Sequence, residues 1–462
     1  MNGGRVTRRE AMKTAGLGAA GLALAGAAGE STERSRQRNV LLYVVDDQGM
    51  GDAGCYGNPE VKTPGLDALA ASGTRFDYGF CTTASCSASR SVILSGLYNH
   101  ANGQYGHQHA YHHFSSFPEV RSLPVMLGEA GYRTLCAGKY HVAPEEVYHF
   151  ERYLKGGAPA NMAEQCRDFI ADDSGAPFFL YFCTTEPHRP FHREGSAEVS
   201  PEDVIVPRYL PDTPECREEL AAYYGSVERA DIGLVRLIEM LRETGHWDDT
   251  LILYISDNGI AFPGAKTTLY DPGMRLPCVI RNPVQSAQGL ACNAMITWAD
   301  ITPTILDYAQ ARPKDAAFHG RSFLSVLDQE DPEGWDEIYA SHTFHEITMY
   351  YPMRVVRTRR YKLIWNIAFG LEYPFASDLW ASKTWQGLIA RGDTHYAKRS
   401  VNAYLHFVGF GIELYDLDAD PDEVVNLADD PAHADVLDEL KRKLRAFQER
   451  TKDPWILKWD YE

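Results

Sequence analysis

Apolar runs along the chain predict strands that end in acidic or histidine residues. The run from Asn39 to Val45 is continuous, apolar and rich in β-branched residues, which is typical of a strand buried on both faces of a parallel sheet. Similar runs extend from Pro177 to Thr184 and from Thr250 to Ser256. Because the carboxyl ends of parallel strands gather ligands and catalytic groups, the polar residues that follow these runs are candidates for a functional site.

Helical periodicity between these runs, for example in Glu218 to Thr244, predicts an alternation of strands and helices through about residue 325. Beyond this point the pattern changes to short antiparallel strands, followed by a helix from about Ala434 to Lys452. The expected strands are Glu337 to Ser341, Met353 to Thr358 and Tyr361 to Asn366. We therefore expect an α/β domain over residues 38–330 and a smaller C-terminal α+β domain, built on an antiparallel sheet, over residues 331–462.

The first residues predict a targeting signal. The pair Arg8-Arg9 lies in the segment Thr7 to Lys13 and precedes an apolar run of small residues from Ala15 to Ala28. This run is too short and too rich in glycine to be a good membrane span. We therefore expect residues 1–28 to be a signal peptide recognised by the twin-arginine translocase. The mature protein is expected to be periplasmic or secreted, without a membrane span.

Composition and charge limit the classes of partner. Of 462 residues, 44% are hydrophobic and 23% are charged, as in an ordinary soluble globular protein. The formal charge of -18 disfavours binding to nucleic acid or to an anionic membrane through general electrostatics. An anionic substrate would therefore be held by a local cluster of cations. The nine cysteines show no CxxC or Cys/His zinc spacing, and their disulfide pairing stays open.

Oxygen-bearing side chains follow two of the predicted strands. Asp46 and Asp47 come directly after the first run, and Asp257 and Asn258 come after the run that ends at Ser256. Oxygen ligands of this kind suit a hard cation such as Ca²⁺, with Mg²⁺ as the alternative, and suit zinc poorly. Taken alone, an Asp-Asp pair is more often a turn or a helix cap.

The segment from Cys86 to Gly96, CSASRSVILSG, follows a polar loop and is expected to begin a helix. It resembles the signature of the sulfatase family, whose fold is an alkaline-phosphatase-like mixed sheet flanked by helices. The resemblance implies that a maturation enzyme oxidises Cys86 to formylglycine and that Arg90 holds the hydrate of this aldehyde. Ala88 stands where the commonest form of the signature has proline, which leaves open the enzyme that matures this chain.

The chemistry of formylglycine explains why sulfate hydrolysis would need a converted cysteine at this position. One hydroxyl of the hydrated aldehyde attacks sulfur, and deprotonation of the second hydroxyl expels sulfate and regenerates the aldehyde. An ordinary serine or cysteine would be left holding a stable adduct. A helix start also offers N–H groups and a favourable dipole to the anion. For a lone cysteine the alternative is a buried residue before an ordinary helix.

The resemblance extends to the residues expected around the nucleophile. Sulfatases bind a divalent cation through residues in the contexts of Asp46, Asp47, Asp257 and Asn258, together with the residue derived from Cys86. The resemblance also implies that two cationic side chains bind the hydrate or the sulfate and that two histidines act on the sulfate and its leaving group. These four residues are Lys139, His141, His188 and Lys266.

Each of these four residues has an expected role. Lys139 would stabilise the hydrate and the anion, and His141, in the segment GKYH, would accept the proton that lets sulfate leave. His188 matches a strand-end histidine that contacts the sulfate or the leaving group. Lys266 replaces an arginine expected in the N-sulfatases, which keeps the charge but loses the bidentate fork. A lone histidine is usually an ordinary surface or core residue, so the role of His141 depends on its motif.

Within the family, the chain is similar from about Arg38 onwards to the N-sulfatases that act on glucosamine in heparan sulfate. The segments that carry this similarity are Asn99 to His109, Ser256 to Tyr270, Asp300 to Tyr308 and Phe344 to Arg354. The last segment is the most discriminating and lies in the smaller domain, where it would contribute to the sugar pocket. The expected substrate-binding residues are His345, Glu346, Tyr351 and Arg354. An edge strand and turn of that domain is the alternative for this segment.

Three functions stay open on the sequence alone. The first is hydrolysis of the N-sulfate of glucosamine in heparin or heparan sulfate saccharides. The second is an O-sulfatase of the same fold, for example one that acts on 6-O-sulfated glucosamine. The third is a non-catalytic binder of sulfated glycans in which Cys86 is never oxidised. A phosphodiester or phosphonate hydrolase of the same superfold is a weaker fourth.

Overall fold

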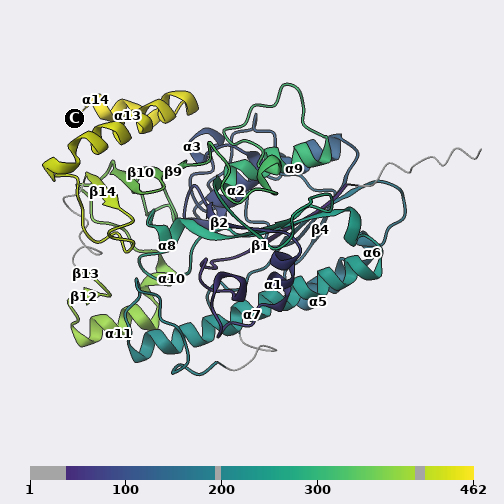
Figure 1. Cartoon of the computed structure of the whole chain (residues 1–462), viewed down its shortest axis with the longest axis horizontal. Coiled ribbons are helices and arrows are strands. Elements are labelled where there is room, and N and C mark those ends of the chain that lie inside the picture. The colour runs from purple at the N-terminus through teal and green to yellow at the C-terminus, as the bar shows by residue number, and fades with distance from the viewer. Residues whose placement is uncertain (1–37, 193–198, 401–410, 462) are drawn as a thin grey trace, which may run out of the picture. The chain divides into compact units, whose positions relative to one another are not determined.

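A computed structural model of the protein describes residues 38–192, 199–400 and 411–461, which belong to one compact unit. The signal peptide predicted over residues 1–28 lies outside the described residues. Two sheets organise the fold (Figure 1), a mixed sheet of eight strands and a smaller antiparallel sheet of four. This arrangement confirms the predicted fold class. The boundary predicted between residues 330 and 331 stays a prediction.

The larger sheet is parallel at its centre and mixed toward one edge. Its strands lie in the order β4 (Arg152–Leu154), β3 (Arg133–Gly138), β5 (Phe178–Cys183), β1 (Asn39–Val45), β6 (Thr250–Ser256), β7 (Arg275–Arg281), β2 (Thr74–Phe80) and β8 (Leu290–Thr297). β1 pairs in parallel with β5 and β6, whereas β7 is antiparallel to both β6 and β2. The three long apolar runs of the sequence are therefore adjacent strands at the centre of the sheet.

Helices cover both faces of this sheet. This arrangement buries both apolar faces of β1. Alternate residues of β1 point into two separate cores, one closed by α1, α5 and α7 and the other by α2, α4 and α9. The helices of the described residues are α1 (Pro64–Ala71), α2 (Cys86–Ser95), α3 (Asn99–Asn102), α4 (Leu123–Glu129), α5 (Pro159–Gln165), α6 (Arg167–Ile170), α7 (Pro214–Glu243), α8 (Asp271–Met274), α9 (Ile301–Ala309), α10 (Ser377–Trp380), α11 (Lys383–Arg391), α13 (Ala434–Thr451) and α14 (Lys458–Tyr461). Short 3₁₀ helices span Gly54–Tyr56, Trp247–Asp249, Trp298–Asp300, Leu324–Val326, Pro431–His433 and Pro454–Leu457. Among the helices of the described ranges, none is long and apolar enough to cross a membrane.

The smaller sheet lies in the C-terminal part of the chain and confirms the predicted antiparallel strands. Its strands follow the order β14 (Ile412–Asp416), β11 (Tyr361–Asn366), β10 (Met353–Thr358) and β9 (Glu337–His342). A separate two-stranded ribbon joins β12 (His395–Tyr396) to β13 (Arg399–Ser400). α13 packs on β10 and β11, as the amphipathic pattern of this helix requires.

Arg354 on β10 holds the C-terminal tail against this sheet and does not contact the cavity. Its guanidinium forms two hydrogen bonds with the Asp453 carboxylate, at 2.6 and 3.0 Å, and both side chains are fully buried. A third bond reaches the His342 carbonyl oxygen at 3.0 Å. Although burial raises the pKa of Asp453, Arg354 lowers it to about 2. The expectation that Arg354 binds sugar is therefore corrected, because every polar group of its fork faces the protein interior.

Replacing Arg354 should destabilise the fold. Arg354→Ala leaves the Asp453 carboxylate buried without its partner, and we expect a loss of about 3–5 kcal/mol in the free energy of unfolding. Guanidinium chloride denaturation measures this loss. Arg121→Ala serves as the control, since Arg121 pairs with exposed Glu129 and Asp315, and its loss should cost less than about 1 kcal/mol. Equal denaturation midpoints for the two variants would contradict the assignment.

Candidate active site

Four polar side chains meet where β1 and β6 end. These strands are parallel neighbours, and Val45 at the end of β1 lies opposite Ser256 at the end of β6. The residues that follow are therefore brought to the same edge of the sheet. They are fully buried and comprise Asp46, Asp47, Asp257 and Asn258.

Asp47 links the two strand ends. Its N–H donates to Asp257 Oδ1 at 3.1 Å, and its own Oδ1 accepts a hydrogen bond from the Asn258 side-chain amide at 2.6 Å. The backbone of Asp47 is left-handed, with φ of 67°, which costs a residue with a side chain about 1–2 kcal/mol. The two hydrogen bonds stabilise the residue in this conformation.

Cys86 begins α2 beside these strand ends. Its thiol lies 3.7 Å from Asp47 Oδ1, and one ligand atom from each of Cys86, Asp46, Asp47 and Asp257 lies within 4.8 Å of the others. Burial raises the pKa of the Cys86 thiol well above its ordinary value. A buried thiol that keeps its proton is a poor nucleophile, so the unmodified side chain is not activated for attack.

The same cluster suits a hard divalent cation. Asp46 Oδ1 and Asn258 Oδ1 are buried and have no hydrogen-bond partner within the described ranges. Burial and the neighbouring Asp46 raise the pKa of Asp257 to about 7, and a bound cation would favour its charged form. Carboxylate and amide oxygens are the ligands that Ca²⁺ and Mg²⁺ prefer. The donor set therefore fits the cation expected from the sequence.

Arg90 and Lys139 compensate two of the carboxylates. Arg90 Nε and Nη2 each lie 2.9 Å from Asp257 Oδ2. Lys139 Nζ donates to Asp46 Oδ2. Burial raises the pKa of Asp46, but the nearby cations, Lys139 foremost, hold it well below its usual range. Since a buried carboxylate without a partner would be protonated, these cations favour the charged forms of Asp46 and Asp257.

A tight turn after β3 positions Lys139 and His141. Gly138 has φ of 91°, and a Cβ at this position would come within 2.0 Å of the Cys183 carbonyl oxygen. His141 Nε2 lies 2.7 Å from His109 Nδ1. Burial and the charge of Lys139 lower the pKa of His141 well below its ordinary value, so the ring is neutral near pH 7. A neutral imidazole is in the form that accepts a proton.

Lys266 is shared by two carboxylates. Its Nζ lies 2.9 Å from Asp47 Oδ2 and 2.9 Å from Asp378 Oδ2. His188 Nε2 faces the same two oxygens, at 3.7 and 3.9 Å respectively. Asp378 lies in α10 and belongs to no motif of the sequence. It is therefore a site residue that the sequence did not indicate.

Part of this site lines one cavity of about 560 Å³, within the range of roughly 300–1,000 Å³ that holds small ligands. The predicted residues in its wall are Cys86, Lys139, His141, His188, Lys266, His345 and Glu346. Glu346 accepts hydrogen bonds from the N–H and hydroxyl of Ser377, which also lines the cavity. A cavity of about 870 Å³ beside Gly54 and Lys62 is larger, but none of the predicted site residues lines it.

Tyr351 lies outside the wall of this cavity, contrary to expectation. Its side chain is buried, and its ring packs edge-to-face on Tyr373 with the ring centres 5.2 Å apart. Residues 345–348 form bends and a turn before β10 begins, so the path of this loop decides the side to which each side chain points. His107 and His109 do line the cavity, although the sequence did not single them out. They lie in the similar segment Asn99 to His109, where a signal was present.

Comparison with known proteins assigns the family. Residues 38–311 match the family model described as sulfatase, and residues 264–373 match the model described as N-sulphoglucosamine sulphohydrolase, C-terminal. Since the first match covers more than half of the chain, the protein belongs to the sulfatase family and is a hydrolase. Enzymes of this family generally use formylglycine and a divalent cation.

Individual members of the family are similar to this chain over most of its length. Human N-sulphoglucosamine sulphohydrolase is 37% identical, with 92% of this chain and 92% of that protein covered. A Ulvan-active sulfatase of Formosa agariphila is 30% identical, with 92% and 82% covered. These similarities confirm the family expected from the sequence.

Solved structures share the fold. One similar structure is a complex with its substrate D-glucosamine-2-N,6-O-disulfate, at a TM-score of 0.67, 21% identity and coverage of 91% of this chain and 99% of that one. A phosphonate monoester hydrolase of Agrobacterium radiobacter gives a TM-score of 0.69 at 20% identity, with 90% and 96% covered. At this level of identity the likeness describes the fold alone.

Proposed function

We propose that the protein hydrolyses the N-sulfate, or sulfamate, of glucosamine residues in heparin or heparan sulfate saccharides. The observation that carries this proposal is the 37% identity to human N-sulphoglucosamine sulphohydrolase over 92% of both chains. The match of residues 264–373 to the C-terminal model of that name supports it. This match includes His345 and Glu346, which line the same cavity as Cys86.

Cys86 is the residue that a formylglycine-generating enzyme would oxidise. Once formed, formylglycine supplies one hydroxyl that attacks sulfur and a second through which sulfate is released. The chain holds this position at the first residue of α2, where free N–H groups and the helix dipole favour negative charge. Because Cys86 is buried, the protein also limits the access of bulk water to the place where the sulfate sulfur would be attacked.

A divalent cation, Ca²⁺ with Mg²⁺ as the alternative, is expected at Asp46, Asp47, Asp257 and Asn258, beside the residue derived from Cys86. When bound, it polarises a sulfate oxygen and favours an ionised nucleophile. Asp46 Oδ1 and Asn258 Oδ1, which accept no hydrogen bond within the described ranges, support this assignment. All the ligands are oxygen atoms, so the donor set favours a hard cation over zinc.

The cationic side chains bind the sulfate in a protein that is acidic overall. Lys139 and Lys266 line the cavity, whereas the net charge of the chain is -18. A local positive group is therefore needed to attract an anionic saccharide. Arg90 lies behind them, fully buried, where its pairing with Asp257 fixes the positive charge near the reacting centre.

Two histidines divide the proton transfers. His188 is about 29% exposed at the cavity wall and is our candidate to protonate the departing amine, since it can exchange protons with water. His141 is buried and neutral, and it accepts the proton whose loss releases sulfate. A sulfamate places greater demand on the first step than an ester, because an amine anion is a poorer leaving group than an alkoxide.

Export through the twin-arginine route to the periplasm or outside the cell remains a prediction from residues 1–28, which lie outside the described residues. The pattern of an arginine pair followed by an apolar run supports it. This route carries folded proteins, so oxidation of Cys86 in the cytoplasm would come before export.

Conversion of Cys86 should be required for activity. We expect the mass of the Cys86 peptide from active protein to be that of formylglycine, and we expect Cys86→Ala to abolish turnover without lowering the melting temperature. Mass spectrometry and thermal denaturation test the two parts. A fully active preparation that contains only unmodified cysteine at this position would refute the assignment.

Removal of the divalent cation should remove activity. Chelation followed by dialysis is expected to abolish sulfate release, and Ca²⁺ or Mg²⁺ should restore it, because the cation polarises the sulfate and favours the ionised nucleophile. Sulfate release and bound-metal content are measured together. Full activity of Asp257→Ala, or recovery with Zn²⁺ as the sole cation, would be inconsistent with this site.

Substrate selectivity should depend on Glu346. If its carboxylate contacts a hydroxyl or amine of the sugar, Glu346→Gln should cost roughly 2–4 kcal/mol in transition-state binding, a factor of about thirty to several hundred in kcat/KM on N-sulfated glucosamine. Hydrolysis of a small aryl sulfate should change far less, because it needs only the catalytic cluster. Defined N-sulfated and 6-O-sulfated glucosamine saccharides are compared on the same preparation.

The matched control is Glu333→Gln, an exposed glutamate outside the cavity, which should behave like the unmodified sequence on every substrate. Equal losses on sugar and aryl substrates in Glu346→Gln would assign Glu346 to the scaffold. Preferred turnover of the 6-O-sulfated saccharide would reject the N-sulfatase proposal in favour of an O-sulfatase.

A further inference from the structure

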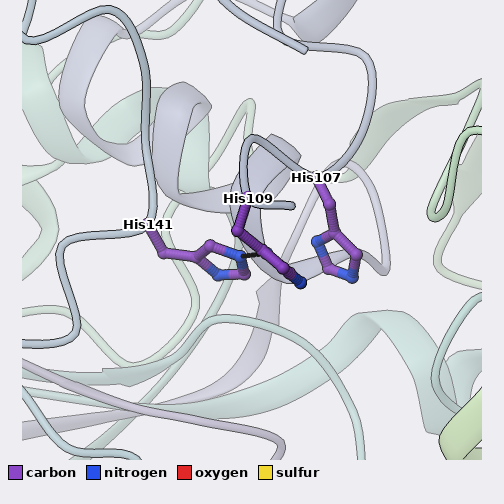
Figure 2. Close-up of side chains that lie close together, drawn as sticks. All are labelled: His107, His109 and His141. Atoms are coloured by element: carbon purple, nitrogen blue, oxygen red, sulfur yellow. Dashed lines mark hydrogen bonds between the residues drawn. The ribbon is translucent and has the colours of Figure 1, made fainter. Parts of the chain in front are cut away.

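Three histidines in the cavity wall lie close together without being part of the carboxylate cluster. They are His107 and His109, from the loop after α3, and His141, from the turn after β3. One ring nitrogen from each lies within 4.8 Å of the other two. Figure 2 shows the three rings side by side, with the hydrogen bond that joins His109 to His141.

Two of these rings carry unsatisfied nitrogen atoms. His107 and His141 are more than nine-tenths buried, and within the described parts of the chain their Nδ1 atoms have no hydrogen-bond partner. A buried polar atom without a partner costs free energy, which a metal bound at His107 Nδ1 would recover, whereas His141 meets His109 through its other ring nitrogen, Nε2. His109 is exposed, so the cluster is open toward the cavity. Solvent can therefore supply a ligand and complete its coordination.

A chain of hydrogen bonds orients His107. Its Nε2 lies 3.0 Å from His345 Nε2, and His345 Nδ1 lies 3.0 Å from Ser85 Oγ. When protons point from His107 through His345 to Ser85, His107 Nδ1 carries a free lone pair. Metal-binding histidines are commonly held in this way, with the second ring nitrogen donating to a neighbour.

The chemistry of this cluster differs from that of the carboxylate site. Imidazole nitrogens prefer zinc, copper and nickel, whereas the oxygens beside Cys86 prefer calcium and magnesium. Burial, followed by the charge of neighbouring groups, lowers the pKa of all three rings, which are therefore neutral near pH 7. Neutral imidazole is the form that binds metal.

The spacing needs little adjustment for a metal ion. Zinc–nitrogen bonds of about 2.0–2.1 Å in a tetrahedral site place the ligand nitrogens roughly 3.3 Å apart. The observed separations include 2.7 Å between His109 and His141 and stay below 4.8 Å for the whole group. Small ring rotations replace the hydrogen bond by two metal bonds.

We propose that His107, His109 and His141 form a second metal site, which binds an imidazole-preferring divalent cation such as Zn²⁺ and inhibits hydrolysis when filled. Inhibition follows because a metal bound to His141 occupies the nitrogen lone pair that accepts the proton. This second part rests on the role proposed above for His141, whereas binding itself does not. The two parts can therefore be tested separately.

Binding is measured by titrating the mature protein with Zn²⁺ by calorimetry, with Ca²⁺ in large excess to keep the carboxylate site filled. We expect one Zn²⁺ per chain at this site. His109→Gln, a substitution at an exposed side chain, should weaken Zn²⁺ binding by at least about 10- to 100-fold. This is the usual effect of losing a residue that only supports a metal ligand, and the loss of a ligand itself should weaken binding at least as much. The control His113→Gln, at an exposed histidine four residues along the chain, should bind Zn²⁺ like the unmodified protein. Equal affinity of the His109→Gln and unmodified proteins would overturn the proposal.

Inhibition is measured on a sulfated substrate with the same Ca²⁺ excess, and each protein is normalised to its own rate without Zn²⁺. The concentration for half inhibition should match the dissociation constant from calorimetry and should rise by the same factor in His109→Gln. Binding without inhibition would overturn the inhibitory role. If the enzyme prefers an O-sulfated substrate, the proposed function fails, but the metal site is still judged on binding.

Discussion

Burial of three carboxylates at the ends of two adjacent strands is the constraint on which the site depends. Asp46, Asp47 and Asp257 are all fully buried, and charges in such surroundings must be compensated or neutralised. The compensation comes from distant parts of the sequence, namely α2, the turn after β3 and the loop before α8. The position of each of these segments therefore depends on its ion pair with one of the three carboxylates. A divalent cation fits this balance because the cluster contains oxygens that accept no hydrogen bond from the described residues.

The sequence indicated which residues would lie together at the centre of the site, because each of them has a local signal. Three apolar runs defined adjacent strands, and the residues directly after two of them, such as Asp46 and Asp257, had to meet at one edge. Cys86 was found through the signature that begins its helix. The antiparallel strands β10 and β11 have the predicted bounds, since alternation and a short turn fix such a pair locally.

The outer wall was harder to predict, because it depends on packing between segments far apart in sequence. Arg354 and Tyr351 belong to a segment with a strong similarity signal, yet both side chains point into the interior. Similarity identified the segment, but the register of β10 and the position of the C-terminal tail decide which side Arg354 faces, and the loop before β10 decides it for Tyr351. Conversely, Asp378 is a single acidic residue without a motif, and only the fold brings it to Lys266.

The sharing of Lys266 between Asp47 and Asp378 joins parts of the chain with different tasks. Asp47 belongs to the carboxylate cluster, whereas Asp378 and its neighbour Ser377 lie in the wall of the cavity. Changes in the outer segment can thus alter which molecules enter while the buried core keeps its chemistry. Such a modular division allows a lineage to explore new substrates by remodelling a few surface loops. The ion pair between Lys266 and Asp378 of α10 is then a point at which that freedom is limited.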